Sequence, residues 1–395
     1  MPVMRLLDGN EAGAYAAKLA RVGVIGVYPI TPQTEMVTRL ARMVAEGELK
    51  AKYITAESEH AAMSICAGAS AAGARVFTAS ASQGIVYMEE VLWAVAGQRL
   101  PVVMAICNRT IAFAGNVRAT HNDSLLQRDN GWIQLYCENS QEVLDTILQA
   151  YRIAENRDVY LPVAVCLDAF SLTHTAMPVE IPDQKDVDTF LPPYKHEYVH
   201  LDPDMPQEIV YGPEPDDVTE YAYQREVAMQ HAKKVVREVD EDYHRHFGRS
   251  YGGPLEEYRC EGAEGVLITM GSITGTAKDV VDEMRRRGQL IGLVKLRAFR
   301  PFPSEEMRAI ASRVKAVGFV DRNFSLGSSG GGVGCVETAR ALYPMEKRPL
   351  LLDFIIGLEG RDVTPDQVEQ MANRVLSAAR TGRVERDVEW VQLRS

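Results

Sequence analysis

The sequence predicts an α/β protein made of two parallel-sheet units. From residue 8 to about 170, short apolar runs alternate with helix-like stretches, which is the pattern of a parallel sheet covered by helices on both faces. A second alternation of the same kind begins at Gly262. The stretch at 172–252 holds eight prolines, which break any long element. We therefore expect α/β domains at 1–171 and 253–395, joined by an extended arm and a charged helix at 172–252.

In the first unit, the expected strands are short and apolar, and the expected helices lie between them. The strands fit residues 22–27, 75–78, 102–107 and 163–167, and the helices fit 35–46, 58–72, 84–96 and 141–155. Pro162 stands just before the last strand, where a strand tolerates proline. Ser58, and either Asn139 or Ser140, supply side-chain oxygens that suit the starts of two of these helices.

The second unit repeats the pattern after a stretch of mixed charge. Its strands fit 266–270, 291–296, 316–320 and 350–355, and a turn at 271–275 leads to a helix at 276–287. The charged stretch before it, 218–247, is typical of a helix. Two interpretations of that helix stay open, one in which it is solvated and one in which it contacts another subunit.

Composition argues against several kinds of partner and site. The net charge of −11 disfavours nucleic acid, because phosphates are neutralised by clustered Lys and Arg. No apolar run approaches the ~20 residues of a membrane helix, and the first residues lack the apolar core of a secretory signal. The six cysteines lack the short spacings of zinc or cluster ligands. We expect no metal site in this chain, and small buried thiols in a reducing cytoplasm.

One loop is distinctive because it combines prolines and a hydroxyl at the end of a strand. It reads YPITP at residues 28–32. The prolines stiffen the backbone, and ligands of open α/β sheets bind at the carboxyl ends of strands. The segment is similar to the YPITP segment in the α subunits of 2-oxoacid:ferredoxin oxidoreductases. The similarity extends from GNEA at 9–12 to GRDVTP at 360–365.

The resemblance implies both a fold and an activity. The fold would be a pyrimidine-type thiamine-diphosphate-binding domain followed by a transketolase C-terminal-like domain. The activity would be the cleavage of a 2-oxoacid with thiamine diphosphate, with electrons leaving through iron–sulfur clusters to ferredoxin.

Glu59 is the expected catalytic and cofactor-binding acid, since it matches the family's catalytic glutamate and Glu57 does not. Thiamine catalysis needs a carboxyl group against N1′ of the aminopyrimidine, in an apolar site where the carboxyl holds a proton near neutral pH. The small residues Ala61, Ala62 and Met63 that follow suit such a site. The alternative is an ordinary acid in the first turn of a helix, favoured by the macrodipole.

Thr31 and Arg109 are the expected clamp for the substrate carboxylate. Arg109 follows the strand at 102–107, so it also lies at a strand's carboxyl end, and an Arg there can bind a carboxylate with two parallel hydrogen bonds. The resemblance gives both residues this task. We count Tyr28 and His121 with them as substrate-binding.

The cofactor contacts are expected in two loops. Pro29 and Ile30 belong to the YPITP loop. Ser82 and Gln83 belong to TASASQG at 78–84, a turn that resembles one lying close to the cofactor in the family. Small residues there let the backbone approach a ligand. The alternative is a simple strand-to-helix turn capped by Ser82.

Arg118 departs from the family pattern, because a bulky apolar residue is expected at its position in pyruvate-type enzymes. A second cation near the clamp suits a substrate with two carboxylates. This indicates oxalate oxidoreductase, with a pyruvate or other 2-oxoacid enzyme that uses coenzyme A as the alternative. Arg118 could instead point outward and pair with Asp123 or Asp129, where an exposed pair contributes little.

The chain also lacks parts that the activity requires. It has no Gly-Asp-Gly segment for Mg²⁺ and the diphosphate, and no cysteine set for a 4Fe-4S cluster. We expect a β subunit to supply the diphosphate site and a cluster, a γ/δ-type subunit to carry further clusters to ferredoxin, and the whole to be a dimer of hetero-oligomers. A self-sufficient transketolase-type transferase and a non-catalytic scaffold are the alternatives from other classes.

A glycine-rich run at 327–334 follows a strand and precedes a helix. It fits neither the dinucleotide nor the P-loop pattern. A tight backbone turn is the expected role, and an anion site is the alternative.

Overall fold

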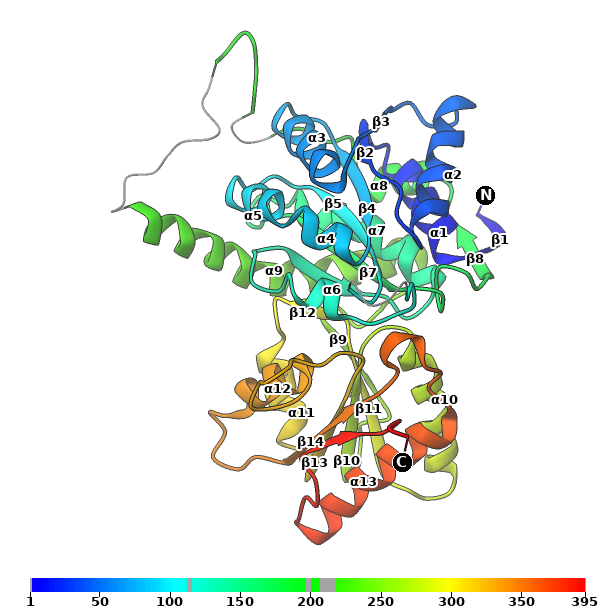
Figure 1. The fold of residues 1–395 in the computed structure, drawn as a ribbon, viewed down its shortest axis with the longest axis vertical. Helices are drawn as coiled ribbons and strands as arrows, with labels where there is room; N and C mark the ends of the chain where they lie inside the picture. The colour runs from blue at the N-terminus through cyan, green and yellow to red at the C-terminus, as the bar shows by residue number, and fades with distance from the viewer. Residues whose placement is uncertain (1, 112–115, 197–199, 207–216, 395) are drawn as a thin grey trace.

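The computed structural model describes residues 2–111, 116–196, 200–206 and 217–394. Two α/β units stand one above the other, with the N-terminal half of the chain in the upper unit and the C-terminal part in the lower one (Figure 1). Parts of the predicted arm, 197–199 and 207–216, and of the loop after Arg109, 112–115, lie outside the described residues.

The upper unit is built on a seven-stranded sheet. Its strand order is β12-β6-β7-β5-β4-β2-β3, with β2 (Val24–Val27), β3 (Lys52–Thr55), β4 (Val76–Ser80), β5 (Val103–Asn108), β6 (Ile133–Tyr136), β7 (Val163–Asp168) and β12 (Ala298–Arg300). All neighbouring strands pair in parallel except the edge strand β12. The predicted parallel sheet is therefore confirmed, and β3 and β6 are strands that the apolar pattern did not reveal.

Helices cover both faces of this sheet. Successive residues of a strand point to opposite faces, so each strand contributes to two cores. In β4, Phe77 belongs to one core and Val76 to the other. The first core lies under α1 (Gly9–Leu19), α2 (Thr34–Ala45) and α7 (Ser140–Ala154), and the second under α3 (Glu59–Ala71), α4 (Gln83–Tyr87) and α5 (Glu89–Gly97). Burial on both faces explains why the strands read as continuous apolar runs.

The segment predicted as an extended arm contains regular structure. β8 (Met177–Ile181) pairs antiparallel with β1 (Val3–Leu7), and α8 (Gln184–Phe190) follows it. The charged helix is α9 (Val218–Phe247). Its second half buries Val236 and Tyr243 in the core of the upper unit, whereas its first turns are exposed. The solvated interpretation is therefore wrong for the second half of this helix, and both interpretations stay open for its exposed first part.

The lower unit has a six-stranded sheet. Its order is β15-β14-β13-β10-β11-β9, with β9 (Leu255–Tyr258), β10 (Gly265–Thr269), β11 (Ile291–Leu296), β13 (Ala316–Asp321), β14 (Leu350–Ile355) and β15 (Val388–Trp390). One face packs against α10 (Ile273–Arg286) and α13 (Pro365–Thr381), and the other against α11 (Ser304–Ala311) and α12 (Val333–Leu342). A short 3₁₀ turn, η2 (Leu358–Gly360), follows β14.

The two units are joined by more than a linker. β12 comes from the C-terminal part of the chain, yet it pairs with β6 and completes the upper sheet. Just before it, Lys295 donates to Glu142 of α7 (Nζ to Oε2, 2.7 Å), and Arg297 donates to Gln149 of the same helix (Nη2 to Oε1, 2.9 Å). All four side chains are buried. The predicted boundary at residue 253 therefore does not separate the two sheets cleanly.

The structure also describes the character of the helices and the state of the cysteines. Among the described residues, no helix has the length and apolar character needed to cross a bilayer. All six cysteines are buried and free of disulfides, which confirms their interpretation as small buried side chains. Burial raises the pKa of the Cys66 thiol to about 12.

Candidate active site

The candidate site lies where four parallel strands of the upper sheet end. Four strands lie next to one another in this sheet, in the order β5-β4-β2-β3. Because they are parallel, the loops after Val27, Thr55, Ser80 and Asn108 leave the sheet at the same edge. These loops carry most of the side chains that the sequence nominated, as expected for a ligand site of an open α/β sheet.

Glu59 is the first residue of α3, directly after its cap. The Ser58 hydroxyl oxygen accepts a hydrogen bond from Ala61 N at 3.2 Å, which confirms Ser58 as the cap. The Glu59 side chain is only 7% exposed. Within the described part of the chain, its carboxyl group has neither a hydrogen bond nor an ion pair. A buried carboxyl group without a protein partner is costly, which marks it as a group placed for an external ligand.

Gly84 of α4 lies beside the carboxyl group of Glu59. A Cβ built on Gly84 would lie 2.7 Å from Glu59 Oε1 and 2.5 Å from Ser80 Oγ, so no other residue fits there. The hydroxyl of Ser80 is also buried, and it has no hydrogen-bond partner among the described residues. An unpaired carboxyl group, an unpaired hydroxyl and a missing Cβ together fit a flat, polar-edged ring such as the aminopyrimidine of thiamine.

The structure brings Thr31 and Arg109 together. Arg109 Nη1 donates to the Thr31 carbonyl oxygen at 2.8 Å, and Arg109 Nε donates to the Asn116 carbonyl oxygen at 3.3 Å. The Arg109 side chain is 8% exposed. Its Nη2 has no partner among the described residues, so it remains available to a carboxylate. Arg109 thus has the geometry of a fixed anion clamp.

The YPITP loop is held in place from beneath. Gln33 Nε2 donates to the Tyr28 carbonyl oxygen at 2.8 Å, and Asn10 Nδ2 donates to the Pro32 carbonyl oxygen at 2.9 Å. Asn10 and Gln33 are both fully buried. Pro29 and Thr31 are exposed, so the loop presents them outward while its backbone is fixed.

Ser82 occupies the turn between β4 and α4. Its φ of +52° lies in the left-handed region, which a non-glycine residue adopts only under constraint. Its hydroxyl donates to the Thr110 carbonyl oxygen at 2.5 Å and also bonds to the Gln83 side chain. Ser82 therefore links its turn to the loop of Arg109, whereas Gln83 is exposed at the start of α4.

Asp123 is a buried residue that sequence analysis did not assign to the site. Its Oδ2 accepts hydrogen bonds from Ser82 N and Arg109 N, each at 2.9 Å, and its Oδ1 accepts from Asn108 Nδ2 and Ser124 N, each at 2.8 Å. The only signal in the sequence was an acid shortly after the clamp arginine. Nothing in the sequence shows that the carboxylate turns back under the strand ends.

Arg118 does not join this group. Its backbone carbonyl accepts from Thr110 N at 3.1 Å, but its exposed side chain lies against Gly360 of the lower unit. The proposed surface partners are engaged elsewhere, because Asp123 is buried as described and Asp129 lies near Arg128 and Arg300. The pairing of Arg118 with either acid is therefore wrong.

His121 is also placed away from the clamp. It is 1% exposed, and its Nε2 lies 2.6 Å from Asp168 Oδ1. Asp168 also accepts from Arg322 Nη1 at 2.8 Å and from Ser272 N at 2.9 Å, and both donors belong to the lower unit. Burial alone would raise the pKa of Asp168, but His121, Arg322 and Ser272 together hold it well below its usual range. His121 thus belongs to a buried contact between the units.

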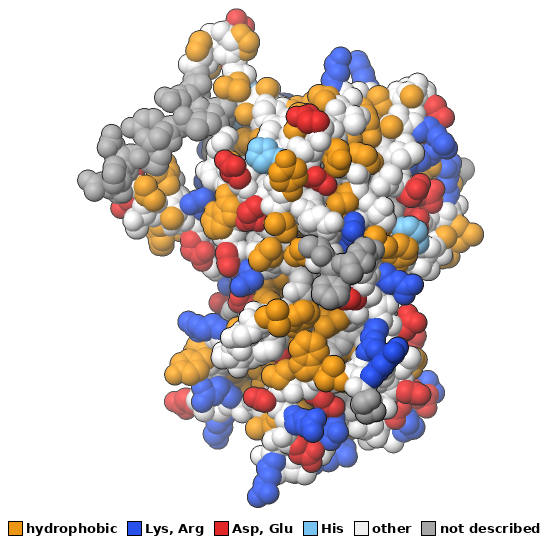
Figure 2. Space-filling model, in the orientation of Figure 1, with side chains coloured by type: hydrophobic (Ala, Val, Ile, Leu, Met, Phe, Trp, Pro, Cys, Tyr) orange, Lys and Arg blue, Asp and Glu red, His pale blue; other side chains and the backbone are white. Residues whose placement is uncertain are grey.

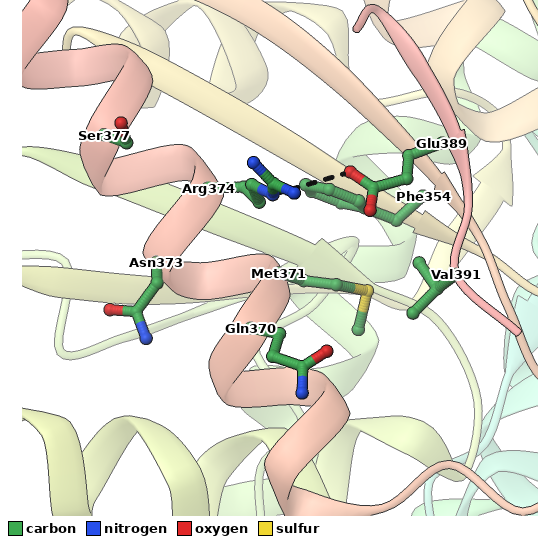
Figure 3. Close-up of a pocket in the computed structure, with 8 residues that line it drawn as sticks. All are labelled: Phe354, Gln370, Met371, Asn373, Arg374, Ser377, Glu389 and Val391. Carbon is green, nitrogen blue, oxygen red and sulfur yellow. Dashed lines mark ion pairs between the residues drawn. The ribbon is translucent and has the colours of Figure 1, made fainter. Parts of the chain in front are cut away.

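One cavity borders the candidate site, and another lies elsewhere in the lower unit. One of about 360 Å³ lies at the junction of the units, and Thr110 and Ile111 beside the clamp line it together with Leu126 and Leu326. Figure 2 shows hydrophobic side chains gathered on the face where the units meet. Another, of about 450 Å³, lies between α13 and β15, with Arg374 directed toward Glu389 (Figure 3). None of the nominated site residues lines the second cavity.

The glycine-rich run is a tight turn closed by the chain's own carboxylates. Gly332 N donates to Asp353 Oδ2 at 2.7 Å, and Cys335 N donates to Asp321 Oδ2 at 2.9 Å. Gly334 N donates to Asp321 Oδ1 at 3.1 Å. These donors at the start of α12 are the ones that an external anion would use. Their occupation disfavours the anion-site alternative and agrees with the predicted turn.

Comparisons with known proteins match nearly the whole chain. Residues 15–241 match the family described as pyruvate flavodoxin/ferredoxin oxidoreductase, thiamine diphosphate-binding, and residues 263–368 match pyruvate:ferredoxin oxidoreductase core domain II. The pyruvate synthase subunit PorA of Methanocaldococcus jannaschii is 48% identical, with 95% of each chain covered. The PorA subunit of Methanothermobacter thermautotrophicus is 45% identical over 99% of each.

Other relatives carry a different substrate name. The ketoisovalerate oxidoreductase subunit VorA of Pyrococcus horikoshii is 43% identical, with 100% of this chain and 99% of the relative covered. Among solved structures, the 2-oxoglutarate:ferredoxin oxidoreductase of Magnetococcus marinus has a TM-score of 0.70 at 18% identity, covering 96% of this chain and 65% of that one. A split-gene transketolase has a TM-score of 0.55 at 13% identity, covering 94% and 99%. These two likenesses confirm the predicted fold class.

Proposed function

Because this chain belongs to the pyruvate flavodoxin/ferredoxin oxidoreductase family, we propose that it is the α subunit of a 2-oxoacid:ferredoxin oxidoreductase. The observation that carries the proposal is the pair of Glu59 and Arg109 at one sheet edge. Among the described residues, the first is a buried acid without a partner, and the second is an arginine whose Nη2 has none. An acid for the cofactor and a clamp for the substrate are the two elements that this half of the site must supply.

The substrate we propose is pyruvate or a similar aliphatic 2-oxoacid, with coenzyme A as the acyl acceptor. The relatives named as pyruvate synthase and ketoisovalerate oxidoreductase subunits support this choice. The oxalate hypothesis gains no support from them. Its structural basis was a second cation beside the clamp, and the Arg118 side chain lies against Gly360 instead.

The residues of the chain take distinct roles in this proposal. Bound thiamine diphosphate would supply the nucleophilic carbon and the electron sink for cleavage. Glu59 would form a hydrogen bond with the pyrimidine ring, and Gly84, which has no side chain, would leave room for that ring. Arg109, with Thr31 beside it, holds the substrate carboxylate through charge-assisted hydrogen bonds. The Ser82 turn, with Gln83, borders the same space from β4.

The rest of the site is assigned to other subunits. The chain has no Gly-Asp-Gly segment, and the described residues hold no cluster of three or more potential metal-ligating acids, histidines or cysteines. We propose that a β subunit contributes the Mg²⁺ and diphosphate half, and that cluster-bearing β and γ/δ-type subunits pass electrons to ferredoxin. The names of the relatives, which are subunits, support a hetero-oligomer.

Reduction of a viologen dye by the reconstituted complex tests the function. Pyruvate or ketoisovalerate, with coenzyme A, is expected to drive reduction, and oxalate is not. The isolated chain should turn over neither acid. Turnover by this chain alone would contradict the shared site, and activity with oxalate only would restore the oxalate hypothesis.

Glu59→Gln identifies the acid within the same assay. We expect a loss of about 10²- to 10⁴-fold in kcat, the range for a positioned acid–base group, with the complex still assembled. Glu57→Gln is the matched control, because Glu57 is two residues away and exposed. A fully active Glu59→Gln complex would indicate a non-catalytic scaffold.

A further inference from the structure

We infer that Asp123 is the positioning residue of this site, a single carboxylate that fixes the substrate clamp and the cofactor turn relative to each other. The inference rests on the proposed function for its catalytic consequence but not for its geometry. Asp123 belongs to the short helix α6 (Asn122–Leu125) and is 0% exposed.

The geometry is specific because one oxygen serves two loops. Oδ2 accepts from Ser82 N and from Arg109 N, both at 2.9 Å. Ser82 follows β4 and Arg109 follows β5, which are adjacent parallel strands. A shift of either loop would therefore break a hydrogen bond to the oxygen that holds the other. The second oxygen, Oδ1, is fixed in turn by Asn108 Nδ2 and Ser124 N.

All four donors are uncharged N–H groups, and the described residues give Asp123 no ion pair. An ionised carboxylate offers only acceptors, whereas a protonated one turns an O–H group toward one of the two donor pairs. An asparagine at this position would likewise turn an N–H group toward one of the two pairs. Ionised Asp123 is therefore the form best suited to accept all four hydrogen bonds.

The surroundings make that ionised form sensitive to pH. Burial raises the pKa of Asp123 to about 6. The ionisable groups among the described residues that interact with it include the charged Arg109 and the uncharged Cys107, Cys166 and Tyr136. Burial raises the pKa of both thiols and of the phenol well above their usual values, so these three stay neutral. Protonation of Asp123 below about pH 6 is expected to release the clamp.

Kinetics of the assembled complex test this inference with two variants. Asp123→Asn should raise the KM for the 2-oxoacid about tenfold or more, the effect of a displaced positioning group, with less change in the KM for coenzyme A. The acid limb of kcat/KM near pH 6 should disappear, because the variant has no group to titrate. Asn108→Leu, which removes one donor but leaves the acid, should shift that limb to higher pH. An unchanged acid limb in both variants would overturn the inference.

Hydrogen exchange of the same complexes gives a readout that does not depend on turnover. Asp123→Asn should remove protection from the peptides containing Ser82 and Arg109 together. The control, Asp145→Asn, changes a buried acid that binds Tyr243 and Arg249 far along the chain, and should leave both peptides protected. Loss of protection in only one peptide would contradict the coupling. A wild-type complex that oxidises no 2-oxoacid would refute the proposed function, while the exchange result would still decide the role of Asp123.

Discussion

The carboxyl group of Glu59 faces Gly84 so closely that a Cβ built on the glycine would lie 2.7 Å from Glu59 Oε1. The two residues come from different helices, α3 and α4, which follow different strands. The acid is buried, and no residue that the structure describes bonds to its carboxyl group. A glycine is required there because any side chain would occupy the space in front of the carboxyl group.

Gly84→Ala should therefore impair both activity and stability. The added methyl group also meets Ser80 Oγ at 2.5 Å, and overpacking of this kind costs about 1–3 kcal/mol. We expect kcat/KM for the 2-oxoacid to fall about tenfold or more, since small displacements of reacting groups have effects of that order.

Gly68→Ala is the matched control for this substitution. Gly68 lies within α3, and a Cβ there meets no atom within 4 Å, so activity should be unchanged and stability should rise by up to about 1 kcal/mol. Equal losses of activity in both variants would show that the space in front of Glu59 is not used by a ligand.

Arg109→Lys tests the clamp while keeping its charge. The guanidinium donates to two carbonyl oxygens and still presents Nη2, a geometry that an ammonium group cannot reproduce. We expect the KM for the 2-oxoacid to rise about 10- to 100-fold, from the loss of one charge-assisted hydrogen bond of about 1.5–3 kcal/mol. Steady-state viologen reduction measures it.

Arg118→Lys provides the comparison, since Arg118 is exposed and lies on Gly360. Its KM for pyruvate should stay within about twofold, as usual for surface substitutions. A rise as large as that of Arg109→Lys would return Arg118 to the substrate site.

Much of the fold could be predicted because the central strands are buried on both faces. Their apolar runs located β2, β4, β5 and β7, and the caps Ser58 and Asn139 marked α3 and α7. β3 was missed because its residues are mostly exposed or half-buried, which leaves no apolar run. β12 could not be foreseen, because a three-residue strand joins the other unit's sheet through contacts distant in sequence.

The grouping of the candidate residues could be predicted from their positions after the strands, whereas their roles stay predictions. Glu59, Thr31, Arg109 and Ser82 follow the ends of neighbouring strands, and parallel pairing alone brings those ends together. Asp123 was missed because three of its four donors are backbone N–H groups, which leave no trace in a sequence. The buried contact of His121 with Asp168 could not be foreseen either, because the two residues lie 47 positions apart in the sequence.

Arg322→Met is expected to weaken the contact between the two units. Arg322 Nη1 donates to Asp168 at 2.8 Å, and both side chains are buried. Removing one partner of a buried pair costs about 3–5 kcal/mol, so urea unfolding should show a lower midpoint. Arg374→Met serves as the control, because Arg374 is 54% exposed in its pairs with Glu385 and Glu389 and such pairs are worth at most about 1 kcal/mol. Equal stability of the two variants would contradict the role of Arg322.

The stability of the lower unit should decrease as the pH rises through neutrality. Asp321 and Asp353 are buried next to each other beneath the glycine-rich run. Burial and, for Asp353, the neighbouring carboxyl group raise both pKa values above the ordinary value, that of Asp353 to about 8. The folded state thus keeps a proton that the unfolded chain releases near pH 4. This contribution is fully present below pH 4 and is lost as the pH rises to about 8.

Thermal unfolding of the assembled complex at several values between pH 5 and pH 9 measures this dependence. Asp353→Asn should flatten the curve, because the amide cannot ionise and the remaining acid no longer faces a second one. Asp279→Asn changes an exposed acid on α10 and should leave the wild-type slope unchanged. A melting temperature that rises with pH in the wild type, or a slope that survives in Asp353→Asn, would show that the two carboxyl groups do not share a proton in the folded protein.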